Sequence, residues 1–356
     1  MKIFFLIFAF AIIFYPQNVN SQIVKYSNDF LQIGGFSSEQ AMAGSNFSSI
    51  SGADAGFSNP ARMFSGDYKV DFSYMHCNYF QSMANFDMAA AVIDTDSLTA
   101  LGLTFLRFGV DDIQNTIYLF DSQGNINYDN ISYFSAADYA LIFSLSRRVK
   151  SFPGLSLGAN IKLIYRMEGS FAKAYGFGFD IAASWQKRKF SASAVLKDVS
   201  TTFNFWSVNS SKFDSVYLST GNSVPENKLE QTAPSLNIGA SYYWNFYRFK
   251  LLTSAALQTF FDGERNMLLH SEFASADLKL GLELSYFDLF FLRFGLSDFQ
   301  HNNRFTLSDK TTVNPSFGAG VSFFRFRFDY AFFASKSAGL NSNMFTLGIR
   351  LGAERH

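Results

Sequence analysis

The chain has 356 residues and a formal net charge of zero, and only 16% of its residues are charged. Soluble domains carry roughly 25% charged residues, and a neutral chain gives no electrostatic basis for capturing nucleic acid. Phe alone accounts for 45 residues, which is more aromatic surface than one soluble core readily hides. The single cysteine, Cys77, excludes an intramolecular disulfide and any zinc site built from cysteines.

Residues Met1–Ser21 have the pattern of a secretory signal peptide. Lys2 supplies the positive start, Ile3–Tyr15 forms the apolar run, and Val19–Ser21 offers small or moderate residues before the cleavage point. Cleavage there makes Gln22 the mature N-terminus, and because this residue is not cysteine we expect no lipoprotein anchor. The apolar run is shorter than the roughly 18 residues of a membrane-spanning helix, and no later run reaches that length.

The stretch Asp29–Met63 contains few large apolar side chains and is too short to fold alone. Ser38–Ala43 is long enough for one helical turn, which Gly44 would end. Asn59 suits a helix N-cap and Pro60 the first helical position, which predicts a second short helix. This segment therefore needs a surrounding structure that buries its anchoring residues. Those residues are Phe30, Leu31, Ile33, Asn59, Pro60 and Ala61.

After Phe64, segments of about ten residues alternate large apolar with small or polar side chains. Tyr175, Phe177 and Phe179, for example, share one face, and glycines separate them. Period two over this length is typical of a tilted membrane-spanning strand. The pattern predicts fourteen strands, although twelve or sixteen are also compatible with it. The fourteen segments are centred near Phe72, Ala89, Leu103, Leu141, Ile161, Phe179, Ala194, Ile238, Ser254, Leu280, Leu292, Ala319, Tyr330 and Leu347.

The connections between these segments alternate between short and long almost without exception. The short ones are Asp94–Ser97, Arg147–Gly154, Gln186–Lys189, Trp244–Arg248, Phe287–Leu289 and the link at Arg325. The long ones are Gly109–Phe134, Asp198–Pro234, Asp262–Phe273, Phe299–Pro315 and Ala334–Asn343. Outer-membrane barrels have short periplasmic turns and long extracellular loops, whereas a soluble β-sandwich has no reason to sort its loops this way.

The sequence therefore predicts an all-β fold located in the bacterial outer membrane. Residues 68–352 are expected to form a 14-stranded antiparallel transmembrane β-barrel. Residues 22–67, here called the plug, are expected to lie in its lumen as a partly helical segment. Charged residues of both signs on inward faces predict a lumen lined by paired charges, rather than a single-sign ion filter. They are Lys162, Arg166, Asp180, Asp277, Lys279, Glu283, Arg293, Arg327, Asp329 and Arg350.

Two of the long loops carry aromatic side chains, which are common anchors in protein interfaces. An equally good interpretation is that these side chains fold over the barrel mouth or stabilise each other. As a binding surface, the expected residues are Tyr118, Phe120, Phe203, Phe205, Trp206 and Tyr217.

The sequence shows no pattern of an enzyme. The four histidines are scattered without metal-ligand spacing, and neither a nucleophile elbow nor a phosphate-binding glycine loop is present. We therefore expect no catalytic residue, no cofactor and no metal, and the protein is predicted not to be an enzyme.

Short motifs near both ends of the mature chain carry a family resemblance. The N-terminal ones are Phe30–Gly34, Ala41–Gly44, Asp54–Ala55 and Asn59–Arg62, and the C-terminal ones are Gly281–Leu284, Leu292–Gly295 and Asp329–Ala331. With a plug before fourteen strands, the chain resembles the FadL-like outer-membrane superfamily, and within it the PorV/PorQ family of the type IX secretion system in Bacteroidetes. Gly35–Gln40 departs from the pattern, since many relatives have an Ala- and Arg-rich run there.

The resemblance implies a non-enzymatic barrel whose extracellular loops bind a protein partner. PorV-like members receive secreted cargo through its conserved C-terminal domain at the large translocon barrel. The implied partners are therefore the translocon barrel, the C-terminal domains of cargo, and outer-membrane lipids. The alternative is a FadL-type channel for hydrophobic small molecules such as long-chain fatty acids. A channel predicts an apolar pocket beside the plug and a lateral gap, but no proline lies inside a predicted strand to mark one.

Overall fold

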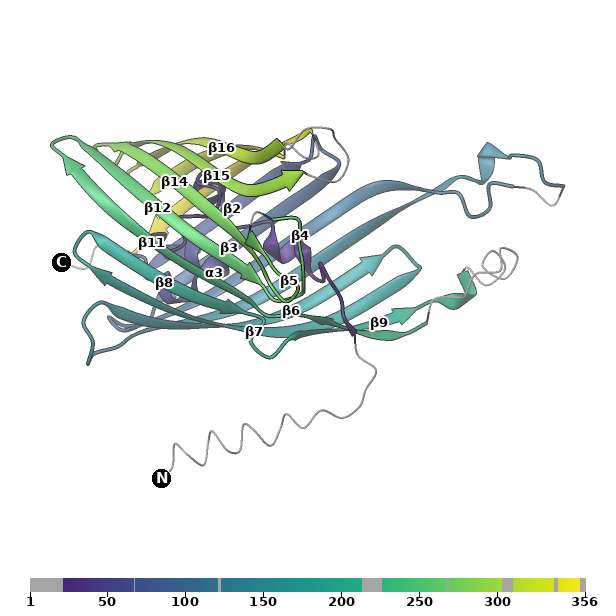
Figure 1. Ribbon diagram of the computed structural model, residues 1–356, viewed down its shortest axis with the longest axis horizontal. Coiled ribbons are helices and arrows are strands. Elements are labelled where there is room, and N and C mark those ends of the chain that lie inside the picture. The colour runs from purple at the N-terminus through teal and green to yellow at the C-terminus, as the bar shows by residue number, and fades with distance from the viewer. Residues whose placement is uncertain are drawn as a thin grey trace, which may run out of the picture.

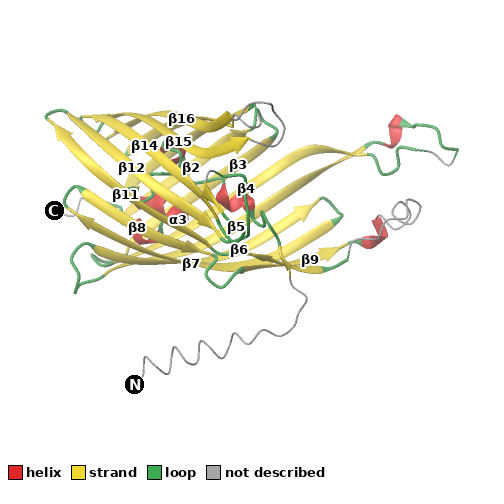
Figure 2. Ribbon diagram, viewed as in Figure 1, coloured by secondary structure: helices red, strands yellow, loops and turns green. Residues whose placement is uncertain are grey.

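The computed structural model describes residues 22–66, 68–120, 123–212, 226–267, 269–302, 310–335 and 339–352. These residues form one closed barrel with the plug inside it (Figure 1, Figure 2). The predicted signal peptide Met1–Ser21 and the loop residue Tyr217 lie outside the described residues. No helix in the described ranges is long and apolar enough to cross a membrane.

The barrel wall has fourteen antiparallel strands within the described ranges, and each predicted centre lies in one of them. Pairing of the last strand with the first closes the barrel. Twelve strands are continuous: β2 (Val70–Tyr79), β3 (Ala84–Asp94), β4 (Thr99–Asn115), β5 (Ser132–Arg148), β6 (Leu155–Glu168), β7 (Ala172–Lys187), β12 (Phe249–Phe260), β14 (Ser275–Tyr286), β15 (Phe290–Asn302), β16 (Lys310–Phe323), β17 (Phe326–Ser335) and β18 (Leu340–Leu351).

The other two wall strands are interrupted. One consists of β8 (Phe190–Lys197) and β9 (Thr202–Val208), and its neighbour consists of β10 (Lys228–Thr232) and β11 (Ser235–Phe246). β7 pairs with both β8 and β9, which shows that the two halves continue one wall strand. Two further strands have only two residues each, β1 (Gln22–Ile23) and β13 (Leu269–His270).

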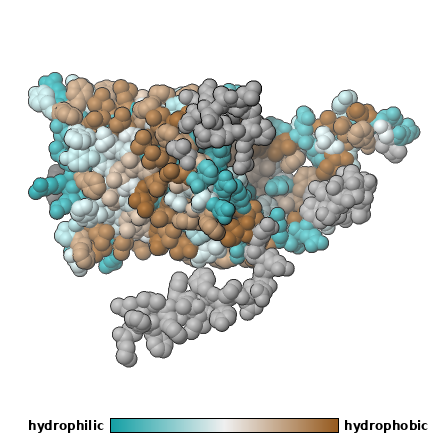
Figure 3. Space-filling model, viewed as in Figure 1, coloured by the Kyte–Doolittle hydropathy of each residue, from teal (hydrophilic) through white to brown (hydrophobic). Residues whose placement is uncertain are grey.

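Period-two alternation gives the wall an apolar outer face and a small or polar inner face. In β7, Tyr175 and Ile181 are exposed on the outside, whereas Ala174 and Asp180 are buried inside. Figure 3 shows apolar side chains gathered over the wall. A closed barrel leaves no unpaired edge in the hydrocarbon layer, and its outward apolar face matches lipid. The fold is therefore that of an outer-membrane barrel.

Connection length distinguishes the two ends of the barrel. The six short turns predicted from the sequence lie at the same end as the C-terminal end of β18, at the left of Figure 1. Two further short turns, residues 80–83 after β2 and residues 169–171 after β6, lie at the opposite end. At the opposite end, β4 and β5 extend far beyond the wall and carry residues 116–131 between them. Because periplasmic turns are short and extracellular loops long, the left end of Figure 1 is periplasmic.

The predicted loop Asp198–Pro234 is wrong at both of its ends. β9 and β10 occupy 202–208 and 228–232, so only residues 209–227 connect them. Asp198 and Thr201 have left-handed backbone angles, φ 55° and 65°, which interrupt the strand as a turn would. Pro234 has no N–H to donate and separates β10 from β11. Gly109–Phe134 is similarly too long, because β4 continues past a bulge to Asn115.

The expectation of strands without proline is also wrong. Pro315 lies inside β16, where it is opposite Leu296 of β15. Pairing of β16 with β17 begins only at Ser316, so the proline sits at a locally open edge. An edge of this kind tolerates proline, since no ladder hydrogen bond is lost.

The plug consists of short helical turns joined by irregular chain. They are η1 (Asp29–Gln32), α2 (Ser37–Gln40), η2 (Gly52–Asp54), α3 (Ala55–Ser58) and η3 (Pro60–Arg62); two further turns lie in the loops, η4 (Tyr128–Asn130) and η5 (Ser210–Lys212). Both turns predicted for the plug are present. The Asn59 Oδ1 accepts a hydrogen bond from the Ala61 N–H at 3.2 Å, with Pro60 at the first helical position.

Candidate functional site: the plug and its contacts with the barrel wall

The residues expected to anchor the plug all lie in the lumen. Phe30, Leu31 and Ala61 belong to one hydrophobic core shared with the wall, and Ile33 packs against it. Asn59 is fully buried, and its Nδ2 donates to the Phe47 carbonyl at 2.9 Å. The structure therefore brings the two ends of the plug into the same core.

The plug backbone lies directly against glycines on the inner face of the wall. A Cβ added at Gly158 would overlap the backbone of Pro60 and Ala61. A Cβ added at Gly295 would overlap the backbone between Met42 and Ala43. Any larger residue at these wall positions would push the plug away, so the glycines let two backbones approach closely.

Buried hydroxyl pairs connect the plug to two separate parts of the wall, β18 and the neighbouring strands β11 and β12. The pairs are Ser37 with Thr346 at 2.7 Å, Ser45 with Ser254 at 2.6 Å, and Ser48 with Ser241 at 2.6 Å. Each bond contributes about 1 kcal/mol, but a buried hydroxyl that loses its partner costs more. Displacing the plug would leave several such groups without partners at once.

Charged side chains also join the plug to the wall. Arg327 of β17 donates from Nη2 to the Asp54 Oδ1 of the plug at 2.6 Å. Arg293 of β15 bonds both Glu283 and Asp329, each at 2.6 Å. These inward charges are paired, as the sequence predicted. A lumen lined in this way has no field of a single sign that would select ions.

The interruption between β8 and β9 is held by buried charges. Lys162 of β6 lies 2.7 Å from the Asp180 carboxylate and 2.5 Å from that of Asp198. The Asp198 N–H donates to the Asp180 Oδ1 at 2.9 Å, and the Thr202 hydroxyl bonds the Asp198 carboxylate. The break in the strand is thus a built feature of the wall.

The N-terminal part of the plug enters the lumen beside this interruption. β1 pairs in parallel with β10, and Gln22 lies opposite Glu230. Further along, Asn28 donates from Nδ2 to the Thr232 hydroxyl at 2.7 Å and accepts from Asn204 at 3.0 Å. The Tyr26 N–H bonds the Asp262 carboxylate, so the segment passes between β10 and the start of the β12–β14 loop.

Glu39 in α2 is the titratable centre of the plug. Burial raises the pKa of its carboxyl from 4.5 to about 7, although the Ser58 hydroxyl and the nearby Lys197 and Lys279 favour the charged form. The Ser58 Oγ donates to Glu39 Oε2 at 2.5 Å. The carboxyl therefore changes its charge near neutral pH within the core of the plug.

Two of the expected partner-binding residues lie in an extracellular loop. Tyr118 and Phe120 are 55% and 63% exposed between β4 and β5. The loop is ordered internally, since the Asn130 Nδ2 donates to the Tyr118 carbonyl at 2.9 Å and the Asn127 N–H to the Leu119 carbonyl at 2.8 Å. These aromatic side chains do not fold back over the barrel mouth.

Phe203, Phe205 and Trp206 are not loop residues, contrary to the prediction, because all three lie in β9. Phe205 is exposed on the outer face, whereas the Trp206 Nε1 donates to Glu230 inside at 2.6 Å. Alternation of Phe203 and Phe205 with Asn204 and Trp206 was the available signal of a strand. Tyr217 lies outside the described residues.

In the parts of the chain that the structure describes, no three His, Cys, Asp or Glu side chains are placed to hold a metal ion. Cys77 is buried and is not part of any such group.

Comparison with known proteins gives structural neighbours of one kind. The chain matches no protein-family model and no curated protein by sequence. The CymD monoaromatic hydrocarbon channel has a TM-score of 0.53 and 13% identity, covering 91% of this chain and 99% of that one. The Ralstonia pickettii toluene transporter TbuX has a TM-score of 0.54 and 12% identity, covering 90% and 99%.

A FadL homologue from Pseudomonas aeruginosa has a TM-score of 0.50 and 13% identity, with 90% of this chain and 98% of that chain covered. The structural neighbours are thus FadL-like outer-membrane barrels. At these identities the likeness shows the fold, and it agrees with the predicted 14-stranded barrel and its location.

Proposed function

We propose that this protein is a closed, non-enzymatic outer-membrane barrel that holds a protein partner, as a component of the type IX secretion system. The observation that carries this proposal is the filled lumen. Plug backbone, hydroxyl pairs and buried charges all bond the wall, so passage through the lumen requires breaking many contacts together. The resemblance of motifs such as Asn59–Arg62 to the PorV/PorQ family supports the assignment to this secretion system.

The β4–β5 projection supplies the surface for the partner. Tyr118, Phe120, Ile126 and Tyr128 are 55%, 63%, 52% and 72% exposed on it. It extends well beyond the barrel at the extracellular end (Figure 1). Exposed aromatic side chains on such a projection are typical of a protein interface. The partner expected there is the translocon barrel or the C-terminal domain of secreted cargo.

Affinity purification from native membranes tests this proposal. The wild-type barrel is expected to recover a translocon barrel or secreted cargo, and a variant with Tyr118→Ser, Phe120→Ser and Tyr128→Ser is expected to lose them. Phe152→Ser is the matched control, because Phe152 is 65% exposed in a periplasmic turn. Unchanged recovery with the triple variant would overturn the role of the projection. Absence of these partners from the wild-type sample would overturn the assignment to the secretion system.

A second candidate function is a FadL-type channel for hydrophobic small molecules such as long-chain fatty acids. The interruptions at Asp198–Thr201 and at Pro234 favour it, because they lie side by side in the wall. The activities named for CymD and TbuX also support a channel. Against it, a cavity of about 290 Å³ beside the plug is not an apolar pocket, because its lining includes Gln40, Lys279 and Asp298 as well as Ile33, Tyr79 and Phe333.

An apolar groove of about 340 Å³ does exist, but it is formed largely by outward-facing side chains such as Tyr74, Phe328 and Leu347. Uptake assays separate the two functions. A channel should take up a labelled long-chain fatty acid and lose uptake with Phe30→Ala or Leu31→Ala. The carrier should show no uptake above that of cells without the protein.

A further inference from the structure

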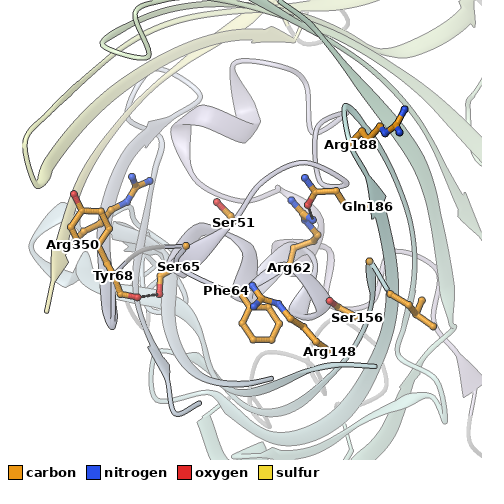
Figure 4. Close-up of a pocket in the computed structure, with 13 residues that line it drawn as sticks. Ser51, Arg62, Phe64, Ser65, Tyr68, Arg148, Ser156, Gln186, Arg188 and Arg350 are labelled. Atoms are coloured by element: carbon orange, nitrogen blue, oxygen red, sulfur yellow. Dashed lines mark hydrogen bonds between the residues drawn. The ribbon is translucent and has the colours of Figure 1, made fainter. Parts of the chain in front are cut away.

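The periplasmic mouth of the barrel contains a cavity of about 650 Å³ between the plug and the wall. This volume lies in the range of roughly 300–1,000 Å³ that is typical of ligand sites. Four arginines from different elements line it (Figure 4): Arg62 of η3, Arg148 of β5, Arg188 of the turn after β7, and Arg350 of β18. The cavity is therefore strongly basic.

Arg62 is held rigidly at the floor of this cavity. Its Nη1 donates to the Gln186 Oε1 at 2.6 Å, and its Nε donates to the Ile50 carbonyl at 3.2 Å. These partners are neutral. Burial lowers the pKa of Arg62, and the neighbouring Arg148 lowers it further. Two guanidinium groups thus lie near each other without a compensating carboxylate among the described residues.

Two of the other three arginines, Arg148 and Arg350, contact aromatic rings, and the Arg148 Nη1 also donates to the Ser97 carbonyl at 2.9 Å. The Arg148 guanidinium stacks over the Phe64 ring at 3.9 Å, and that of Arg350 lies 5.9 Å from the Tyr68 ring. The carboxylate described near Arg350 is that of Asp71, at 3.9 Å. The positive charge of the cavity is therefore largely unneutralised within the described residues, and an anion would lower its energy.

The arrangement of the arginines limits the kind of anion. In Figure 4, Arg350 lies at one edge of the cavity, Arg62 and Arg148 lie in its middle, and Arg188 lies at the opposite edge. A single phosphate could engage at most the neighbouring guanidinium groups of Arg62 and Arg148, and it would leave Arg350 and Arg188 at the two edges unused. A lipid headgroup would carry its acyl chains into a polar lumen, which is unfavourable. A row of separated guanidinium groups instead suits an extended chain with several carboxylates.

The turns beside the cavity add to its positive field. Arg147 and Arg148 end β5, with Lys150 in the turn that follows, and Lys187 ends β7, with Arg188 and Lys189 in the turn that follows. Clustered charges of one sign raise the local concentration of ligands of opposite sign and speed their association. We propose that the periplasmic mouth of the barrel binds an acidic segment of a periplasmic polypeptide. This site is independent of the extracellular partner.

A binding titration on the full-length protein in zwitterionic detergent tests the proposal. The probe is a blocked peptide of alternating Ser and Glu, about ten residues long, which can extend across the cavity. Arg148→Gln and Arg188→Gln should each weaken its binding about threefold to tenfold, and added salt should weaken binding to the wild type. Arg248→Gln, in another periplasmic turn outside the cavity, should leave binding unchanged.

Three results would overturn the proposal. A peptide of alternating Ser and Gln that binds equally well would show that charge is not recognised. Inorganic phosphate that competes as strongly, with the same loss in the two arginine variants, would show a small-anion site. Equal weakening by Arg248→Gln would show a general attraction to the basic rim. Barrel mobility on unheated gels confirms that each variant is folded.

Discussion

Two sides of the barrel hold the plug by different means. Along β14–β18 the wall is continuous, and the plug contacts it through the glycine Gly295 and the ion pair of Arg327 with Asp54. Along β8–β11 the wall is interrupted, and the N-terminal part of the plug is held there by hydrogen bonds of Asn28. On the continuous side, the plug cannot leave unless the wall also moves. On the interrupted side, the N-terminal part of the plug can detach locally, as the frayed end of a strand does.

The difference suggests that one plug combines a fixed body with a replaceable end. Buried charges and close backbone contacts fix the body, because each group that loses its partner there is costly. The two-residue pairing of β1 with β10 consists of backbone hydrogen bonds at the end of a strand. Such bonds open more easily and can be replaced by those of another strand. The predictions below test this contrast, starting with the largest expected effect.

Arg327→Ala should destabilise the protein most. It removes the ion-pair partner of the buried Asp54 carboxylate, which keeps only the hydrogen bonds from the Ser38 and Ser73 hydroxyls. Breaking a buried pair in this way typically costs about 3–5 kcal/mol. Urea unfolding from detergent micelles measures the change. Arg325→Ala, in the neighbouring turn, should change the free energy of unfolding by only about 0.5 kcal/mol. If the two variants lowered the free energy of unfolding equally, the ion pair of Arg327 with Asp54 would not contribute specifically to stability.

Raising the pH should destabilise the plug through Glu39. Its pKa of about 7 in the folded protein lies above its ordinary value of 4.5, so folding favours the protonated form. The resulting stability is complete below pH 4.5 and is lost as the pH rises through 7, by an amount on the order of 3 kcal/mol. Glu39→Gln should flatten this dependence in unfolding curves measured from pH 4 to pH 9. If the free energy of unfolding of Glu39→Gln depended on pH as that of the wild type does, Glu39 would not be the group responsible.

Asn28→Ala should have the smallest global effect and a clear local one. It removes hydrogen bonds to Thr232 and Asn204, worth about 1–2 kcal/mol together. Hydrogen exchange should quicken in residues 22–32 and stay slow in residues 36–64. Faster exchange throughout the plug would mean that its end and its body are one unit.

The sequence predicted the barrel well because its signals repeat. Each wall strand has the same alternation with a period of two, and all fourteen predicted centres lie in strands. The lengths of the connections independently indicate which end of the barrel is periplasmic. The Asn59–Pro60 pair predicted its helical turn because capping depends on neighbouring residues alone. Local rules of this kind need no knowledge of the rest of the fold.

The site is predicted less completely from the sequence, because the interruptions in two of the wall strands have the sequence pattern of loops. Asp198 and Pro234 are ordinary turn residues by composition. Only the pairing of β8 and β9 with β7, and of β10 and β11 with β9 and β8, shows that the wall continues through them. Trp206 was therefore placed in a loop, although it faces Glu230 inside the barrel. The glycine contacts and the arginine cavity depend on which distant strands meet the plug, which no local pattern records.

A tether between plug and wall tests most directly whether the plug stays fixed while the barrel works. The hydroxyls of Ser48 and Ser241 are 2.6 Å apart, as are those of Ser45 and Ser254. Cysteine pairs at these positions, in a Cys77→Ala background, should form disulfides on oxidation. The account predicts equal recovery of the partner from native membranes by the oxidised and reduced proteins. Recovery that falls on oxidation and returns on reduction would show that the plug must move.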